Sequence, residues 1–151
     1  WISAMPTNLY GPGDNYDLEK SHVLPALLRK VHEAKISGSQ KVVLWGSGTP
    51  KREFLHCDDL ADALVFLLKH YSSSCHINVG SGVDVSIRSL VETIAKVVQY
   101  DVELVFDASK PDGTPRKLMD STRLHELGWN NVRTLEDGIR STYFDWLESG
   151  S

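Results

Sequence analysis

The sequence predicts an α/β domain, because short apolar runs typical of strands alternate with longer segments whose apolar residues recur at helical spacing. Turn-forming residues separate most of these segments, and no repeat or low-complexity segment interrupts the alternation. The chain has 151 residues, of which 41% are hydrophobic and 24% charged. These values fit one globular domain with a sizeable core.

The first third of the chain is expected to hold a strand and a helix. Residues 1–9 form an apolar strand, and the turn-rich segment 10–15 follows it. Residues 23–36 place three leucines and a valine at helical spacing. Pro25 fits the first turn of this helix, where a missing N–H costs nothing. The Ser-Gly-Ser run at 37–39 ends it.

The segment 41–59 is expected to organise the chain around a tight turn. An apolar strand ends at Trp45, glycines at 46 and 48 permit positive φ, and a second strand begins near Arg52. We therefore expect the tryptophan ring and the guanidinium on adjacent strands of a hairpin. That pair suits a ligand with a flat ring and a phosphate group. A surface hairpin with a half-buried tryptophan is the alternative.

The second half of the chain continues the alternation. Residues 60–71 are almost continuously apolar, which predicts a helix buried on several sides, capped by Asp58 or Asp59. The polar loop 107–120 contains two prolines and three basic residues, and loops of this length are usually functional or disordered. The other expected elements are strands at 76–79, 83–85 and 103–106, and helices that follow Ser86, Ser121 and Thr134 as their caps.

Composition excludes several classes of function. A net charge of −4 disfavours a general binder of nucleic acid or of acidic membranes. Cys57 and Cys75 are too few and too separated for a disulfide scaffold or a cysteine-rich zinc site. The histidines lack metal-ligand spacing, so no metal is assigned. No run reaches membrane-spanning length and no signal peptide is seen, so a reduced, cytoplasmic protein is expected.

Basic side chains and one histidine are the candidates for chemistry. His22 precedes a helix after a polar loop and could act as a general acid, although a loop histidine packed on the helix start is the alternative. No glycine-rich phosphate loop follows a strand, and Gly80-Ser81-Gly82 is too short to count as one. Five basic residues could hold a diphosphate if the fold gathers them, or could be solvated charges: Lys30, Arg52, Lys110, Arg116 and Lys117.

Five segments carry a resemblance to a known family. They are PTNLYGP at 6–12, SHVLPAL at 21–27, VLWGSGTP at 43–50, REFLHCDDL at 52–60 and KPDGTPRK at 110–117. In this order they resemble the GDP-L-fucose synthase family of the extended short-chain dehydrogenase/reductase superfamily, essentially along the whole chain. The pattern at 52–60 alone indicates only the superfamily. The loop at 110–117, together with the Ser-His-Val segment, is more specific.

The resemblance implies the carboxyl-terminal part of such an enzyme, that is, the end of a Rossmann sheet plus a small α/β substrate domain. Residues 1–15 would end the NADP-binding domain, residues 16–151 would form mostly the substrate domain, and about 53–80 would return to the Rossmann sheet. The family's glycine-rich NADP loop, its Ser/Tyr/Lys reduction triad and its catalytic cysteine have no match here. The abrupt apolar start also suggests a fragment, and the isolated chain is expected to be inactive.

The resemblance also implies a reaction and its residues. The family converts GDP-4-keto-6-deoxy-D-mannose to GDP-L-fucose by 3,5-epimerisation and NADPH-dependent 4-reduction. His22 would be the catalytic acid. At position 30 the family often has arginine, so a point charge is expected there instead of a bidentate contact. The implied NADP contacts are Pro6, Thr7, Asn8, Leu9 and His22, and the implied GDP-sugar contacts are Lys30, Trp45, Arg52, Asp112 and Lys117.

Two other functions also fit the sequence. One is a stand-alone module that binds sugar nucleotides. The other is part of a related epimerase or dehydratase acting on UDP- or dTDP-sugars, against which the loop at 110–117 argues. In the favoured interpretation the partner is a GDP-sugar, with no nucleic acid and no membrane, and the full-length enzyme is a homodimer.

Overall fold

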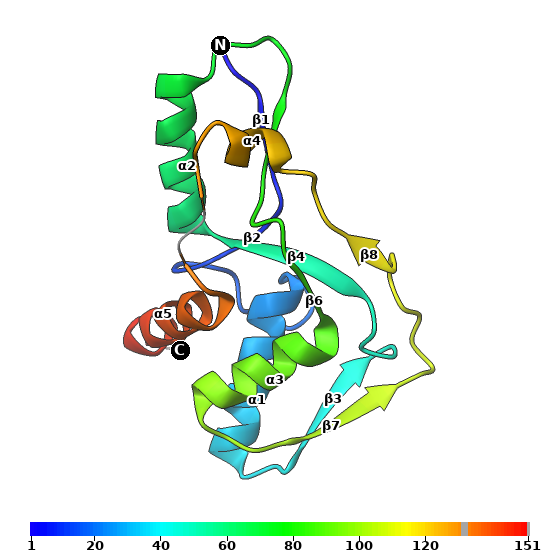
Figure 1. Cartoon of the computed structure of the whole chain (residues 1–151). Helices are drawn as coiled ribbons and strands as arrows, with labels where there is room; N and C mark the ends of the chain where they lie inside the picture. The colour runs from blue at the N-terminus through cyan, green and yellow to red at the C-terminus, as the bar shows by residue number, and fades with distance from the viewer. Residues whose placement is uncertain (131–132, 151) are drawn as a thin grey trace.

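A computed structural model of the chain describes residues 1–130 and 133–150. The helices α2 and α4 lie with β1 at one end of an elongated molecule, and α1, α3, β3 and β7 lie at the other (Figure 1). The elements in chain order are β1 (Ala4–Pro6), β2 (Asn8–Tyr10), α1 (Val23–Ser37), β3 (Lys41–Trp45), β4 (Lys51–His56), α2 (Cys57–His70), β5 (Ile77–Val79), β6 (Asp84–Ser86), α3 (Ile87–Val98), β7 (Glu103–Asp107), β8 (Arg116–Lys117), α4 (Thr122–Glu126) and α5 (Leu135–Glu148).

Strand β4 connects the two ends of the molecule, because its two halves pair with different strands. Residues 54–56 pair with β2 in parallel. Residues 51–53 pair with β6 in antiparallel fashion, and residues 51–52 also pair with β8 in parallel. Two further parallel pairs, β1 with β5 and β3 with β7, form separate two-stranded sheets. Parallel pairs joined by helices are typical of α/β folds.

The expected hairpin does not form, because β3 pairs with β7 and not with β4. Gly46 and Gly48 have positive φ, as predicted, but Pro50 has no N–H to offer to a ladder. The turn therefore carries the chain from one sheet to another. The expected strand at 1–9 is also divided: its backbone switches partners at Thr7, whose N–H donates to the carbonyl of Val79 at 3.0 Å.

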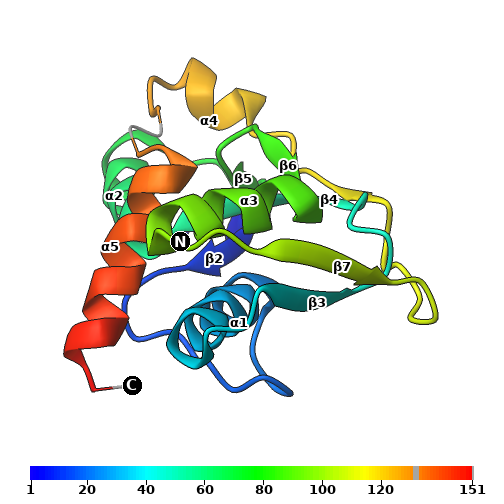
Figure 2. The ribbon, with the colours of Figure 1, turned by 90° about the horizontal axis from the view of Figure 1, so that it is seen from below.

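The main core lies between the helices α1, α3 and α5, which pack beside one another, and the sheet β3–β7 (Figure 2). The amphipathic pattern of each helix turns its apolar stripe toward this space. The buried residues of the main core are Tyr10, Leu24, Leu27, Leu28, Val31, Ala34, Val42, Leu44, Phe54, Leu90, Val91, Ile94, Val97, Val98, Ile139, Tyr143 and Trp146.

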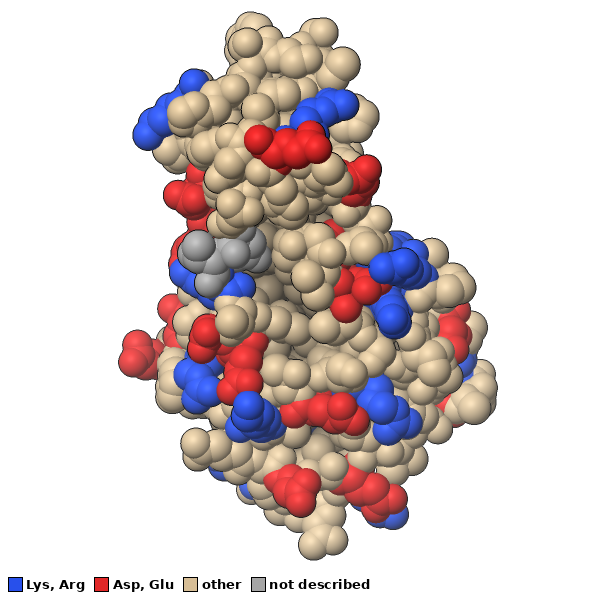
Figure 3. All heavy atoms as spheres, viewed as in Figure 1, with Lys and Arg blue, Asp and Glu red and all other residues tan. Residues whose placement is uncertain are grey.

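A smaller second core lies under α2, and there the prediction of burial on several sides is wrong. Ala63 and Leu67 of α2 are buried, but Val65 is 51% exposed and Leu68 74% exposed. Within the described residues α2 packs through one face only. The tip of the molecule at this end shows no Lys, Arg, Asp or Glu in the view of Figure 3. The second core consists of Leu55, Ala63, Leu67, Ile77, Val79, Leu124 and Trp129.

Side-chain hydrogen bonds cap the start of three helices, α2, α3 and α5. Ser86 and Thr134 cap α3 and α5 as predicted, each accepting the N–H three residues further on, at 3.0 and 3.1 Å. The expected aspartate cap of α2 is wrong, because Nδ1 of His56 accepts the N–H of Asp58 at 3.2 Å. Asp58 and Asp59 instead lie in the first turn, where negative charge is favourable.

Candidate functional site

A cavity of about 360 Å³ opens between α1, the end of β3, the start of β4 and the loop at 111–113. We call it the Trp45 cavity. It brings together Lys30, Trp45, Arg52 and Asp112, which are four of the five residues predicted to contact a GDP-sugar. Its remaining lining residues are Leu18, Glu19, Ser21, Val23, Ala26, Leu27, Leu44, Gly48, Pro50, Ile87, Pro111 and Gly113.

The ring of Trp45 is exposed and lies near two positively charged side chains. The alternation of β3 buries Val42 and Leu44 and leaves Trp45 68% exposed. The ammonium groups of Lys30 and Lys110 lie 5.9 and 5.6 Å from the centre of the indole ring, within the range of cation–π attraction. An exposed aromatic ring beside two cations can hold a flat ring that carries negative charge.

Arg52 is tied to the loop that closes the cavity. Its Nη1 donates to the carbonyl oxygens of Lys51 at 2.7 Å and Thr114 at 2.6 Å. The parallel register of β4 and β8 places Lys117 opposite Arg52. Lys117 is exposed and does not line the Trp45 cavity, so it is the one predicted GDP-sugar contact that lies outside it.

Asp112 lines the Trp45 cavity but is engaged by the turn beneath it. Its Oδ1 accepts the N–H of Ser47 at 2.8 Å, and its Oδ2 accepts the Ser47 hydroxyl at 2.6 Å. These bonds hold the pKa of the Asp112 carboxyl below its usual range. A Cβ at Gly46 would lie 2.2 Å from Oδ1, so only glycine allows this approach. The Asp112–Ser47 hydrogen bonds were not predicted, although the glycine before Ser47 is a signal for such a close approach.

A second cavity, of about 440 Å³, contains most of the predicted NADP contacts. Thr7, Asn8, Leu9 and His22 line it together with residues 10–14 and Cys57. Pro6 does not line it, because Pro6 ends β1 opposite Val79. We call this space the His22 cavity. A Cβ at Gly11 would lie 2.3 Å from the Cys57 sulfur, so the wall of the cavity depends on a glycine there.

His22 is the N-cap residue of α1, with extended backbone and no side-chain capping bond. Its side chain is exposed and faces the second cavity, so the imidazole is available to a bound molecule. Helix α1 lines the Trp45 cavity through Lys30, and its N-cap residue His22 lines the other cavity. Lys30 lies eight positions after His22, which corresponds to a helical rise of about 12 Å.

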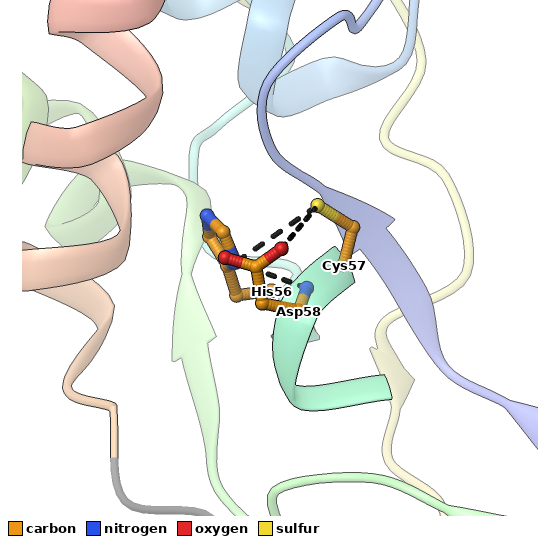
Figure 4. A group of neighbouring side chains, drawn as sticks. All are labelled: His56, Cys57 and Asp58. Carbon is orange, nitrogen blue, oxygen red and sulfur yellow. Dashed lines mark hydrogen bonds and ion pairs between the residues drawn. The ribbon is translucent and has the colours of Figure 1, made fainter. Parts of the chain in front are cut away.

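A polar cluster at the end of β4 has the composition of a metal site. Ligand atoms of His56, Cys57 and Asp58 lie within 4.8 Å of one another (Figure 4). However, Nδ1 of His56 already accepts a backbone N–H, and the Arg133 guanidinium lies against that ring and 3.1 Å from Asp58. Burial and the nearby guanidinium lower the pKa of His56. A metal ion bound to these atoms would have to displace Arg133 and break its contacts with His56 and Asp58. We therefore assign the cluster a structural role.

Tyr16 and Lys20 have the Tyr-x-x-x-Lys spacing that short-chain reductases use at a carbonyl, but their setting differs. The segment is a loop, and the Tyr16 ring stacks on Trp146 with centroids 4.5 Å apart. Burial raises the pKa of Tyr16 to about 12. Tyr16 lines neither the Trp45 cavity nor the His22 cavity, so we give the pair no role in reduction.

The parallel strand pairs joined by helices define an α/β protein, and the chain belongs to the NAD dependent epimerase/dehydratase family, whose model matches residues 1–80. The chain is 59% identical to GDP-L-fucose synthase 1 of Arabidopsis thaliana, over 96% of its own length and 45% of that protein. It is 56% identical to GDP-L-fucose synthase of Escherichia coli K12, over 97% of its length and 49% of that protein. The chain thus spans about half the length of these relatives.

Solved structures agree with this assignment. A GDP-L-fucose synthetase from Naegleria fowleri bound to NADP superposes with a TM-score of 0.92 at 33% identity, over 98% of this chain and 47% of that chain. A UDP-glucose 4-epimerase from Thermotoga maritima, at 21% identity, shows the same fold with a TM-score of 0.82. The predicted fold, part of an extended short-chain dehydrogenase/reductase, is therefore confirmed. Within residues 1–130 and 133–150, no helix is both long and apolar enough to cross a membrane.

Proposed function

We propose that this chain is the carboxyl-terminal, GDP-sugar-binding half of an enzyme that makes GDP-L-fucose from GDP-4-keto-6-deoxy-D-mannose. One observation carries the proposal: most of the residues expected from the family resemblance to bind sugar nucleotide and cofactor, far apart in sequence, gather in two cavities, one beside α1 and one at its N-cap residue. The 56–59% identity to GDP-L-fucose synthases supports the same conclusion.

The Trp45 cavity would hold the nucleotide. The exposed Trp45 ring offers a stacking surface for the guanine or the sugar. Arg52 has donors beyond its Nη1, and a guanidinium can bind the diphosphate with two parallel hydrogen bonds. Lys30 and Lys110 add positive charge beside the ring. Lys117, on the strand next to Arg52, would extend this charge toward a ligand that protrudes from the cavity.

The His22 cavity would hold the reacting sugar ring next to the nicotinamide of NADP. The residues present fit one wall of a cofactor site, formed by residues 7–9 and the small Gly11, and the glycine-rich phosphate loop of the family has no match in this chain. NADPH, when bound, supplies the hydride for the carbon at position 4. His22 would hold the proton that returns to a sugar carbon acidified by the neighbouring 4-keto group.

The exposed face of α2 would be covered by the remaining part of the NADP-binding domain. Residues 1–15 and about 53–80, which include β1, β2, the end of β4, α2 and β5, would belong to that domain, and the rest mostly to the substrate domain. The exposed Val65 and Leu68 support this division, because an apolar helix face is stabilised when another element packs on it. The isolated chain would then lack epimerase and reductase activity, and the complete enzyme would be a homodimer.

The test is calorimetric titration of the chain with GDP, with UDP as the competing nucleotide. We expect GDP to bind at least about tenfold more tightly than UDP, and Arg52→Ala to weaken GDP binding by about tenfold or more, because a charge-assisted contact to phosphate is lost. The matched control is Arg140→Ala, an exposed arginine of α5 that lines neither cavity.

Three outcomes would contradict the proposal. Equal or tighter binding of UDP would favour a UDP- or dTDP-sugar enzyme. Unchanged GDP binding in Arg52→Ala would move the nucleotide out of the Trp45 cavity. Oxidation of NADPH by the isolated chain in the presence of the 4-keto sugar nucleotide would show that this half is active by itself.

A further inference from the structure

Glu53 is a carboxylate buried in the middle of β4, with an exposed fraction of 0%. Side chains alternate along a strand, so Glu53 lies on the face opposite to Arg52 and Phe54. None of the ion pairs within residues 1–130 and 133–150 includes it. Burying a carboxylate without a cation is costly unless hydrogen bonds replace the lost water. The bonds that Glu53 accepts therefore indicate why it is there.

The two carboxylate oxygens of Glu53 hold two different segments of the chain. Oε1 accepts the N–H of Gly82 at 2.7 Å and the Ser81 hydroxyl at 3.4 Å. Oε2 accepts the N–H of Met119 at 3.1 Å, from the segment that directly follows β8. A Cβ at Gly80 would lie 2.4 Å from Oε1, so the turn at 80–82 is shaped to receive this carboxylate.

The backbone of Glu53 reaches toward the His22 cavity. Its carbonyl oxygen accepts from Nδ2 of Asn8 at 2.8 Å and from the Thr7 hydroxyl at 3.5 Å. The next residue along β4 toward its start is Arg52, which lines the Trp45 cavity. Glu53 thus contacts two residues that line the His22 cavity and is the neighbour of Arg52 in the Trp45 cavity. It also anchors the segment that follows β8, the strand that contains Lys117.

We propose that Glu53 is a positioning residue that sets the strand β8, and with it Lys117 and the loop bound to Arg52, relative to the ligand site. This inference rests on the proposed function. A carboxylate suits the task because both of its oxygens are acceptors, and two N–H groups from separate segments face them. A glutamine would present its amide NH₂ group to one of these N–H donors, so it can hold only one of the two segments.

The test compares the chain with Glu53→Gln in two measurements. Amide hydrogen exchange should become faster at Gly82 or Met119, while the amides of β3 and β7 keep their protection. GDP titration of the folded protein should show affinity weakened by about three- to tenfold. The matched control is Leu55→Ala, a buried residue on the same face of β4 as Glu53, which removes apolar contacts but none of these hydrogen bonds.

The two measurements separate positioning from stability alone. A purely structural residue would lower the unfolding midpoint, as Leu55→Ala should, without changing the GDP affinity of the folded fraction. Unchanged affinity and unchanged exchange at Gly82 and Met119 in Glu53→Gln would overturn the proposal. If that variant does not fold, Met119→Pro removes one donor and leaves Glu53 in place, and it should weaken GDP binding similarly, whereas wild-type affinity would overturn the inference.

A failure of the proposed function would be seen separately. If the unaltered chain binds neither GDP nor UDP, the nucleotide assignment fails, but the exchange experiment still decides whether Glu53 holds the two segments. Faster exchange at Gly82 or Met119 would then support the structural link by itself, and unchanged exchange would overturn it.

Discussion

The two ends of the molecule differ in how completely they cover their apolar residues. In the main core, the helices α1, α3 and α5 and the sheet β3–β7 bury the apolar side chains that they turn toward one another. Around the second core, α2 buries one stripe and leaves Val65 and Leu68 exposed, although its sequence is almost continuously apolar. Apolar density in a helix therefore predicts how much surface needs covering, but not which segment covers it.

The largest expected effect tests this difference with two leucine truncations. Leu28, in the main core, has an exposed fraction of 0%, whereas Leu68 of α2 is 74% exposed. Leu28→Ala should lower the free energy of unfolding by about 2–5 kcal/mol, because it leaves a cavity. Leu68→Ala should change it by less than about 0.5 kcal/mol. Urea unfolding of both variants measures these free energies. An equal loss of unfolding free energy in the two variants would show that the outer face of α2 is covered in solution.

An intermediate effect is expected at the helix starts on the two sides. The Thr134 hydroxyl accepts the N–H of Asp137 at the start of α5. Thr134→Ala should therefore lower the free energy of unfolding by about 1 kcal/mol. Ser121 precedes α4, but its buried hydroxyl makes no capping bond and has no hydrogen-bond partner within the described residues. Ser121→Ala should therefore be neutral or slightly stabilising in the same unfolding assay. A loss of about 1 kcal/mol at Ser121 would mean that its hydroxyl has a partner in solution.

The smallest expected effect concerns pH. Burial lowers the pKa of His32, which packs on the main core, and burial together with Arg133 lowers the pKa of His56. As the pH falls through 6.5, the ordinary pKa of histidine, the unfolded chain takes up protons that the folded chain does not. The free energy of unfolding therefore decreases until the pH reaches the lowered pKa values of the folded state. Each histidine should contribute less than about 0.7 kcal/mol between pH 7 and pH 6.

The measurement is the unfolding free energy of His32→Gln and His56→Gln at several pH values between 7 and 5. Each substitution should flatten the pH dependence, whatever its effect at neutral pH. The exposed His76, at the end of the molecule near β5, provides the control variant His76→Gln. If His56→Gln loses stability more steeply than the unaltered chain on acidification, the pKa of His56 is raised by folding and not lowered. That result would exclude a neutral, buried imidazole at this position.

Much of the local structure was predictable, because local chemistry decides it. The caps Ser86 and Thr134, the turn glycines Gly46 and Gly48, and the helix stop at Gly38 each follow from a residue's own hydrogen-bonding or backbone preferences. Most of the predicted ligand residues line the two cavities, with Lys117 and Pro6 outside them, and their contacts with a ligand stay predictions.

The sequence by itself determined where most helices and strands form, since periodicity and caps act over a few residues, although it predicted 1–9 as one strand and β8 as part of a loop. Only the tertiary structure decided the partners. It paired β3 with β7, matching Val43 with Val105, in place of the hairpin that the short turn suggested. It also buried Glu53 between segments 29 and 66 residues away, and left one face of α2 exposed. Strand pairing and burial depend on contacts between distant segments, and no local pattern encodes which distant segment will supply them.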